Sequence, residues 1–200
     1  MYKRQKQAIA KDLKNATLIS VAEQVGRSPS SVSRLFLEAT GMTFTDYLTG
    51  QRMEKANQLL GQPYAIHGEV VHGNHIGGRL LGFTTANILP PPIKRLPRYG
   101  VYVSRVLVDG VYYKGVTNIG KKPTVGGEYP AGVETYIFGL EGDIYGKNIE
   151  VQILAFDRPE QKFTSLEELK ERIEKDKEFA NAYYETVSYT HLTLPTICSV

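Results

Sequence analysis

The sequence predicts an α+β protein of two domains: an N-terminal all-α helix-turn-helix, then a small antiparallel Greek-key β-barrel with a C-terminal helix. Three observations support this fold class. Apolar residues recur at helical spacing up to about residue 60, β-branched residues then form short runs between turn signals, and an amphipathic stretch follows at residues 165–185. We expect domains at residues 1–60 and 61–186, with a non-native tail at residues 187–200.

The N-terminal residues read as helices. A short helix at Val21–Val25 is followed by a turn at Gly26, and Ser28 then caps a helix whose first residue is Pro29. That helix has an apolar face of Val32, Leu35 and Phe36, it ends at Gly41, and a longer helix follows at about Thr43–Leu60. Two short helices across a tight turn leave four residues exposed where the second helix could meet DNA: Ser30, Ser31, Ser33 and Arg34.

This region resembles the DNA-binding part of AraC-type regulators. The resemblance covers ISVAEQVGRSPSSVSRLFLEATGMTFTDYLTGQRMEKANQLL, in which SRLF, GM, YL and RM keep the family spacing. The family has two such units joined by a long helix, whereas this chain has one unit and the joining helix. DNA contact would therefore require a partner subunit, and the alternative is a helical appendage that packs or dimerises.

Charge is uneven along the chain, whose formal net charge is +3. Residues 1–62 hold nine Lys and Arg against five Asp and Glu, whereas residues 63–186 hold fifteen against sixteen. The basic end is the natural place for a nucleic-acid surface, and a solvated basic face is the alternative.

The middle of the chain has the pattern of short strands. Valine-rich runs at residues 101–108 and 111–116 flank Asp109-Gly110, which is a strong hairpin signal. We expect a further strand at Val133–Phe138 and a pair at Ile144–Tyr145 and Ile149–Phe156, which together indicate a small barrel. Ser165 then caps a helix with apolar positions at Leu166, Leu169, Ile173 and Phe179.

A glycine-rich stretch precedes Thr85-Ala86-Asn87. Its glycines are Gly73, Gly77, Gly78 and Gly82, and such a loop can bring backbone N–H groups close to phosphate oxygens. Thr85 and Asn87 offer neutral oxygens that suit Mg²⁺. The stretch is neither a Walker A motif nor a dinucleotide-binding fingerprint, so the signal is weak by itself.

Several stretches in order resemble the riboflavin kinase module of bacterial riboflavin kinase/FAD synthetases. They are GEVVHGNHIGGRLLGFTTANI, GVYVSRV, YKGVTNIGKKPTV, GVETYIFGLEGDIYGKNIEV and RPEQKFTSLEELKERIEKD, and they cover nearly all of residues 61–185. The resemblance implies transfer of the ATP γ-phosphoryl group to the riboflavin 5′-hydroxyl, with Mg²⁺ as cofactor. The adenylyltransferase half of those enzymes is unmatched, which implies formation of FMN without FAD.

The resemblance also implies roles for individual residues. Glu134 matches the catalytic base, and Thr85 and Asn87 match the Mg²⁺-ATP residues; the alternatives are a solvated strand glutamate and a turn-stabilising pair. The glycine loop with Arg79 would cover the phosphates, although Arg79 could equally be solvated. The matches near the flavin are Phe83, Asn87, Arg158 and Phe163, and Phe163 could instead be core. Thr84 stands where the family usually has proline, which implies weakened metal or nucleotide binding.

Strand alternation places Glu134 and Tyr136 on one face, and Thr135 and Ile137 on the other. A carboxylate on the inward face of a barrel would be costly without a task or a partner. The orientation of this strand therefore bears directly on the role of Glu134.

The last residues differ from the rest. Residues 187–200 carry no Lys, Arg, Asp or Glu and break the helical period, and VSYTHLTLPT resembles a translated reading frame of a transposon adaptor for DNA libraries. A natural strand-like tail is the alternative. The junction at Leu60-Gly61 could likewise be artificial. Three interpretations of the chain therefore stay open: a riboflavin kinase, a flavin-sensing transcriptional regulator and an artificial fusion.

Composition excludes several classes of protein. No apolar run is long enough to span a bilayer, and the first residues lack the apolar segment of a secretory signal. Cys198 is the only cysteine, so no intramolecular disulfide and no cysteine-based metal site can form. We expect a cytoplasmic protein without a membrane partner.

Overall fold

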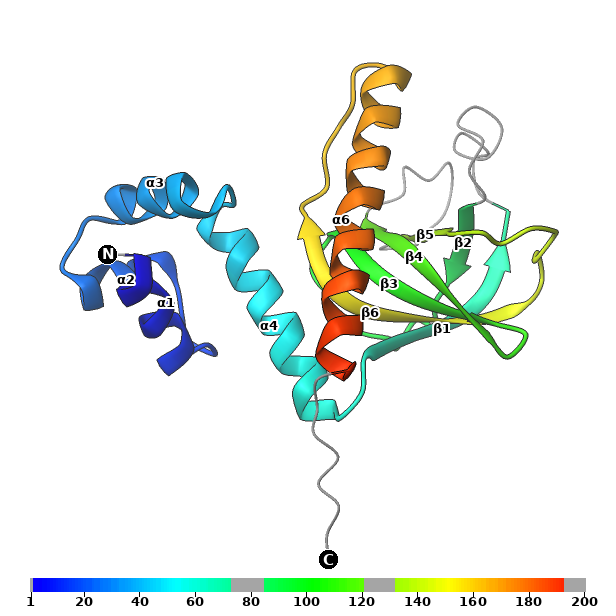
Figure 1. Cartoon of the computed structure of the whole chain (residues 1–200), viewed down its shortest axis with the longest axis horizontal. Helices are drawn as coiled ribbons and strands as arrows, with labels where there is room; N and C mark the ends of the chain where they lie inside the picture. The colour runs from blue at the N-terminus through cyan, green and yellow to red at the C-terminus, as the bar shows by residue number, and fades with distance from the viewer. Residues whose placement is uncertain (1, 73–84, 121–131, 193–200) are drawn as a thin grey trace, which may run out of the picture.

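The computed structural model describes residues 2–72, 85–120 and 132–192. Four helices precede a closed β-barrel, and a long helix lies along the outside of the barrel (Figure 1). The helices are α1 (Tyr2–Lys11), α2 (Leu18–Val25), α3 (Pro29–Thr40), α4 (Phe44–Leu60) and α6 (Leu166–Leu192). The strands are β1 (Tyr64–Val71), β2 (Thr85–Leu89), β3 (Gly100–Val108), β4 (Val111–Gly120), β5 (Gly132–Ile137) and β6 (Asn148–Arg158). Within these residues, no helix is long and apolar enough to cross a membrane.

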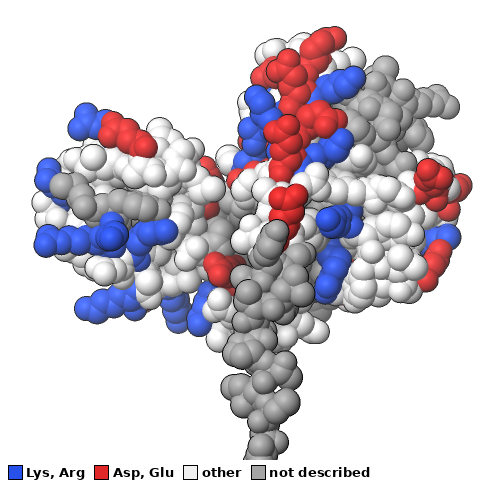
Figure 2. All heavy atoms as spheres, viewed as in Figure 1, with Lys and Arg blue, Asp and Glu red and all other residues white. Residues whose placement is uncertain are grey.

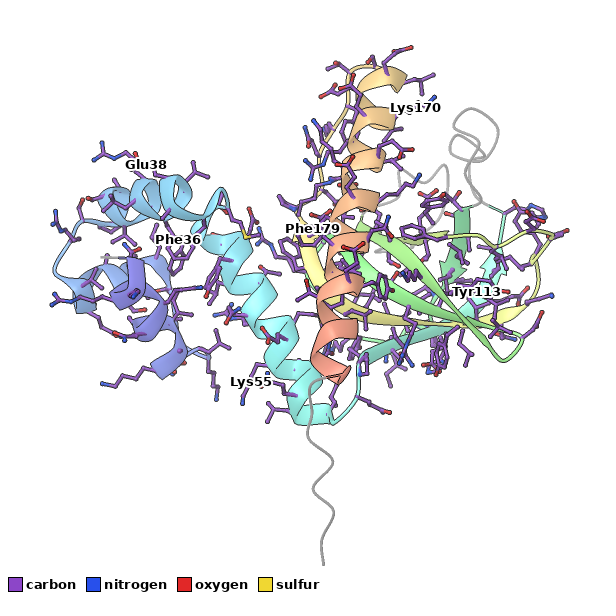
Figure 3. All side chains as sticks on the ribbon, viewed as in Figure 1. Phe36, Glu38, Lys55, Tyr113, Lys170 and Phe179 are labelled. Atoms are coloured by element: carbon purple, nitrogen blue, oxygen red, sulfur yellow. The ribbon has the colours of Figure 1, made fainter. Side chains whose placement is uncertain are left out.

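The caps expected at the end of α2 and the start of α3 are present. The Ser28 hydroxyl accepts from the Ser31 amide at the start of α3, Pro29 is the first helical residue, and Gly26 ends α2 in the left-handed conformation. Phe36 is fully buried and makes edge-on contacts with Phe44 and Tyr47, with ring centroids 5.5 and 5.0 Å apart. It points into the helical group in Figure 3, whereas Glu38 of the same helix points away.

The barrel has the strand order β1-β2-β5-β4-β3-β6, closed by the pairing of β1 with β6. The consecutive strands β3, β4 and β5 form a meander, and its last strand, β5, returns to lie beside β2, which is a Greek key. The expected hairpin at Asp109-Gly110 is confirmed, because both residues have positive φ (48° and 82°), as a two-residue hairpin turn requires.

Two strand predictions need correction. Strands β1 and β2 were not expected, because glycine and polar residues interrupt their apolar pattern. The predicted strand at Ile144–Tyr145 is wrong: these residues lie in a turn in which the Lys147 amide donates to the Ile144 carbonyl, and the turn is bonded to Val70 at the end of β1.

The barrel interior explains the orientation of β5. Its core includes Ile66, Ile88, Ile119 and Ile153, all almost completely buried. Three hydroxyls share this interior and bond one another: Thr117 lies 2.7 Å from Ser104 and 2.9 Å from Thr135, measured between the side-chain oxygens. Because Thr135 faces inward, its neighbours Glu134 and Tyr136 face outward.

Helix α6 covers the outer surface of β3 and β4 (Figure 1). It begins as expected, with the Glu168 amide donating to the Ser165 hydroxyl at 3.1 Å. It continues to Leu192, so the expectation that the helical pattern breaks at Val187 is wrong. The rest of the tail, residues 193–200, lies outside the described residues.

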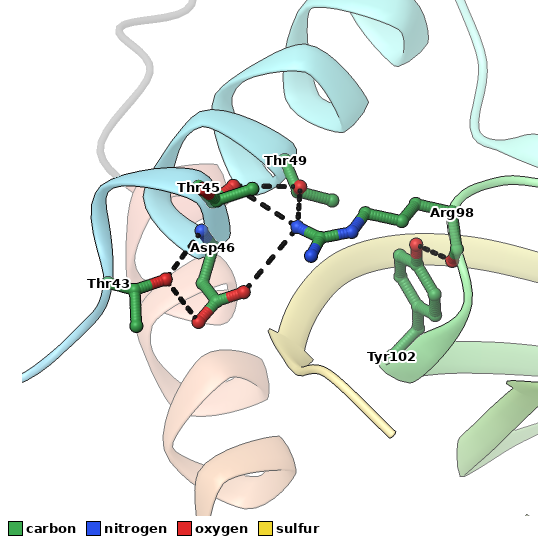
Figure 4. A network of polar contacts seen from close by, with 6 residues as sticks. All are labelled: Thr43, Thr45, Asp46, Thr49, Arg98 and Tyr102. Carbon is green, nitrogen blue, oxygen red and sulfur yellow. Dashed lines mark hydrogen bonds and ion pairs between the residues drawn. The ribbon is translucent and has the colours of Figure 1, made fainter. Parts of the chain in front are cut away.

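Both ends of α4 are bonded to the barrel. Near its C-terminus, the Asn57 amide donates to the Ile153 carbonyl at 2.9 Å. Near its N-terminus, Arg98 donates to the Thr49 hydroxyl at 2.9 Å and lies 3.5 Å from an Asp46 carboxylate oxygen (Figure 4). The Arg98 carbonyl in turn accepts from Tyr102, whose side chain is buried in the barrel core and whose pKa burial raises to about 12.

Candidate active site

A row of side chains crosses the outer face of the barrel. The strand register places Asn87 of β2 opposite Glu134 of β5, Glu134 opposite Asn118 of β4, Asn118 opposite Val101 of β3, and Val101 opposite Arg158 of β6. Directly paired residues on one face have Cβ atoms about 5 Å apart. The row therefore sets a carboxylate between two amides at one end and a guanidinium at the other.

A cavity of about 290 Å³ lies over this row, between the sheet and α6. Its floor comes from β2 to β6, and its walls come from α6 and the segment that joins β6 to α6. The lining residues are Thr85, Val101, Val116, Asn118, Glu134, Tyr136, Arg158, Glu160, Gln161, Phe163, Leu169, Ile173 and Asp176. Such a mixture of apolar walls and a few polar groups is typical of a small-molecule site.

Glu134 is outward-facing but not freely solvated. It is half-buried under the cavity, and Asn87 beside it is only 7% exposed. Thr85 lies two residues from Asn87 on β2, so both side chains leave the strand on the same face, with Thr85 opposite Tyr136. The structure therefore brings together the predicted residues Thr85, Asn87 and Glu134.

The donor set at this end suits a hard cation that arrives with phosphates. A hydroxyl, an amide oxygen and a carboxylate are the oxygen ligands that Mg²⁺ prefers. Among the described residues, no group of three or more His, Cys, Asp or Glu side chains could hold a metal ion. The residues present fit a Mg²⁺ that takes most of its remaining ligands from a nucleotide and water.

The other end of the cavity is built around Arg158. Its guanidinium donates from Nε and Nη2 to the two carboxylate oxygens of Asp176 on α6, at 2.8 and 2.7 Å. The Phe163 ring lies 5.8 Å from the guanidinium carbon and lines the same cavity. The predicted flavin residues Arg158 and Phe163 thus lie together, on the opposite side of the cavity from Glu134.

A second carboxyl, that of Asp157, lies beside Asp176. The pKa of Asp157 is raised to about 7, chiefly by burial and then by repulsion from, and hydrogen bonding to, the neighbouring Asp176, while Arg172 and Arg158 lower it. Asp176 also accepts from Arg172 at 3.0 Å. Asp157 thus lies in one group with Asp176, Arg158 and Arg172, and it holds its proton until the pH approaches 7.

Sequence reasoning missed Asn118 and Asp176. The alternation of β4 places Val116 and Asn118 on one face, but only the register with β5 shows that this face carries Glu134. Asp176 lies in the middle of a helix rich in charged residues, and nothing in the pattern separates it from its solvated neighbours. Six predicted site residues lie outside the described residues: Gly73, Gly77, Gly78, Arg79, Gly82 and Phe83.

The predicted DNA-contacting residues lie on α3, and none of them lines the cavity. Ser30 and Arg34 are exposed, whereas Ser31 and Ser33 are half-buried. Arg34 makes an ion pair with Glu38 at 3.8 Å. Figure 2 shows Lys and Arg side chains gathered over the N-terminal helices, while α6 carries both signs of charge.

Comparison with known proteins places the barrel in a family. Residues 60–184 match the family model described as flavokinase, riboflavin kinase. The bifunctional riboflavin kinase/FMN adenylyltransferase of Bacillus subtilis is 42% identical over 134 residues, which cover 66% of this chain and 42% of the relative. The protein of the same description from Listeria monocytogenes is 37% identical over 137 residues, covering 68% of this chain and 43% of the relative. The matched part thus spans less than half the length of these curated relatives.

The fold is similar to that of a solved structure from another bacterium. A Streptococcus pneumoniae chain described as a macrolide-efflux protein is 32% identical, with a TM-score of 0.59, and the match covers 71% of this chain and 48% of that chain.

Proposed function

This chain belongs to the riboflavin kinase family, and we propose that it transfers the γ-phosphoryl group of ATP to the 5′-hydroxyl of riboflavin. The observation that carries the proposal is the placement of Glu134 at the end of an apolar cavity, beside Thr85 and Asn87. A carboxylate next to oxygen ligands for a cation is the arrangement that phosphoryl transfer to an alcohol requires.

In the proposed reaction, Glu134 accepts the proton of the riboflavin 5′-hydroxyl as the hydroxyl oxygen bonds to the γ-phosphorus. The bond from that phosphorus to the bridging oxygen of ADP breaks, and ADP leaves with the electron pair. Positioning of the hydroxyl supplies much of the rate in such transfers, since little covalent work falls to the protein. Asn87 and Asn118 would hold the carboxylate in the required orientation from both sides.

Thr85 and Asn87 would hold Mg²⁺, which neutralises phosphate charge when it is bound. The family resemblance assigns the phosphates to Gly73, Gly77, Gly78, Arg79 and Gly82. At the far end of the cavity, Phe163, Leu169 and Ile173 offer apolar contact for an isoalloxazine ring, with Arg158 beside them. Phe83 would join the flavin contacts.

The kinase proposal is tested with purified full chain, riboflavin, ATP and Mg²⁺, with FMN followed by chromatography. Wild type should form FMN, and Glu134→Gln should lose at least about 100-fold in kcat while still binding riboflavin. Glu141→Gln, which alters an exposed loop glutamate, is the matched control and should keep full activity. Riboflavin binding without turnover in the wild type would refute the enzyme proposal.

We also propose that residues 1–60 form an AraC-like helix-turn-helix domain beside a kinase domain at residues 61–186. The exposed Ser30 and Arg34 on a capped α3, within a basic region, favour a flavin-sensing regulator as the second candidate function. A gel shift with DNA flanking riboflavin genes at low salt, with and without riboflavin, tests this. An Arg34→Ala variant should lose the shift, and its persistence would exclude α3 as the contact.

The adaptor-like tail is a proposal about the origin of the sequence. Sequencing the source DNA across residues 60–61 and 187–200 decides it. A continuous natural reading frame through both points would exclude an artificial fusion.

A further inference from the structure

We propose that Asp176 is a positioning residue for substrate recognition: it fixes the guanidinium of Arg158 so that its remaining N–H groups meet the carbonyl edge of the flavin ring. This inference rests on the proposed function, because it takes a flavin as the ligand. Asp176 itself acts through Arg158.

A β-bulge brings Arg158 to the outer face. Along β3, Val101 pairs with Arg158 and the next residue, Tyr102, pairs with Phe156, so Asp157 is the extra residue of the bulge. Phe156 faces the core, where its ring makes an edge-on contact with Tyr102 at 5.3 Å. Without the bulge, simple alternation from Phe156 would turn Arg158 inward.

The bonds to Asp176 determine the direction of the guanidinium. The side chain of Asp176 is 4% exposed and that of Arg158 is 12% exposed, so solvent screens the pair weakly. The two parallel bonds have the forked geometry in which arginine and carboxylate planes align. A third bond, from Nη1 to the Pro159 carbonyl at 3.1 Å, completes the restraint.

Arginine has five N–H groups, and the three bonds to described residues leave one on each Nη nitrogen. These two N–H groups lie in the plane that Asp176 fixes, and they suit a ligand edge that presents carbonyl oxygens. The pyrimidine edge of a flavin presents such carbonyls, whereas its dimethylbenzene edge presents none.

The row of paired residues indicates how a flavin would lie along the cavity. Arg158 lies three strand spacings from Glu134, which is roughly 14 Å between backbones. The side chains between them are Asn118 and Val101, with Val116, Leu169 and Ile173 around them. A ligand with its hydroxyl at Glu134 therefore extends across β4 and β3, with its ring over apolar side chains and its far edge at Arg158.

The test measures equilibrium binding of riboflavin and of lumiflavin, which keeps the ring but lacks the ribityl chain, by flavin fluorescence. Asp176→Asn preserves the shape and one acceptor oxygen but removes the charge, and it should weaken both ligands about tenfold. Arg172→Gln is the matched control, because Arg172 bonds the same carboxylate but does not line the cavity. It should change both dissociation constants less than about twofold.

A double-mutant cycle separates positioning from a merely structural role. In an Arg158→Ala background, Asp176→Asn should cause no further loss of flavin affinity, because its effect passes through Arg158. An equal loss in both backgrounds, a change confined to ATP affinity, or absence of flavin binding in the wild type would each overturn the inference.

The kinase proposal can fail independently of this inference. A wild type that binds lumiflavin but makes no FMN would refute the kinase proposal while the cycle still decides the role of Asp176. Glu134→Gln should leave lumiflavin affinity unchanged, since that ligand lacks the hydroxyl that meets Glu134.

Discussion

Glu134 on β5 lies directly opposite Asn118 on β4, and both side chains line the same cavity. A directly paired amide is close enough to orient a carboxylate or to donate to a hydroxyl held beside it. This relationship places Asn118 in the candidate site although no motif drew attention to it.

We predict that Asn118→Ala lowers kcat about tenfold, with a smaller effect on the KM for ATP, because the candidate base loses an orienting neighbour. Steady-state kinetics of FMN formation measure the effect. Asn148→Ala, at the start of β6 and outside the cavity lining, is the control. Unchanged kinetics in Asn118→Ala would remove this residue from the site.

Asp157 predicts a pH dependence of stability. Its pKa is raised from 3.8 to about 7 in the folded chain, so between these values the folded state holds a proton that the unfolded state has released. The free energy of unfolding contributed by this group therefore falls as pH rises from about 4 to 7 and is constant above that range.

Asp157→Asn should remove this slope. The charged groups around Asp157 are Arg158 on β6, Asp176 and Arg172 on α6, and Asp46 and Glu160 across an adjoining cavity. Because other carboxyls also titrate, the measured quantity is the difference between variant and wild type in urea unfolding at several pH values. A difference that does not grow between pH 4 and 7 contradicts the assignment.

Gly100 packs closely against the residues of the β6 bulge, so we expect a side chain at this position to disturb both the barrel and Arg158. Its φ is 155°, and a Cβ there would lie 2.5 Å from the Arg158 carbonyl oxygen and 2.7 Å from the Phe156 ring. Gly100→Ala should therefore destabilise the chain by about 2 kcal/mol or more and shift Arg158. Thermal unfolding and riboflavin affinity measure the two effects.

The control for Gly100 is Gly50→Ala in α4. A Cβ at Gly50 would make only an ordinary contact with Phe156, at 3.9 Å, and alanine favours the helix by about 1 kcal/mol. This variant should be as stable as the wild type or more so. A Gly100→Ala protein of equal stability would show that the backbone there adapts freely.

Arg98 predicts how the N-terminal helices are attached to the barrel. Arg98→Met removes the bonds to Thr49 and Asp46 but keeps an apolar stem, so we expect a loss of only about 0.5–1 kcal/mol, because the arginine is 43% exposed. Hydrogen exchange in the first turns of α4 should speed up while the barrel is unchanged. Arg95→Met, an exposed neighbour outside this network, should leave exchange unaltered.

The sequence by itself determined the local features of this protein. The caps at Ser28 and Ser165, the left-handed turn at Gly26 and the Asp109-Gly110 hairpin each depend on a few adjacent residues, and the structure has all of them. The order of the motifs indicated the family and predicted that Thr85, Asn87 and Glu134 belong to its active site. These features are local because backbone conformation and capping are decided within one turn or one strand.

Only the tertiary structure decided which residues share a surface. The bulge at Asp157 turns Arg158 outward, the register of β4 with β5 sets Asn118 beside Glu134, and the packing of α6 brings Asp176 to Arg158. Strands β1 and β2 likewise form because partners far along the chain complete their hydrogen bonds. A one-residue change in register reverses every side chain of a strand, so these relationships depend on long-range pairing that no local pattern specifies.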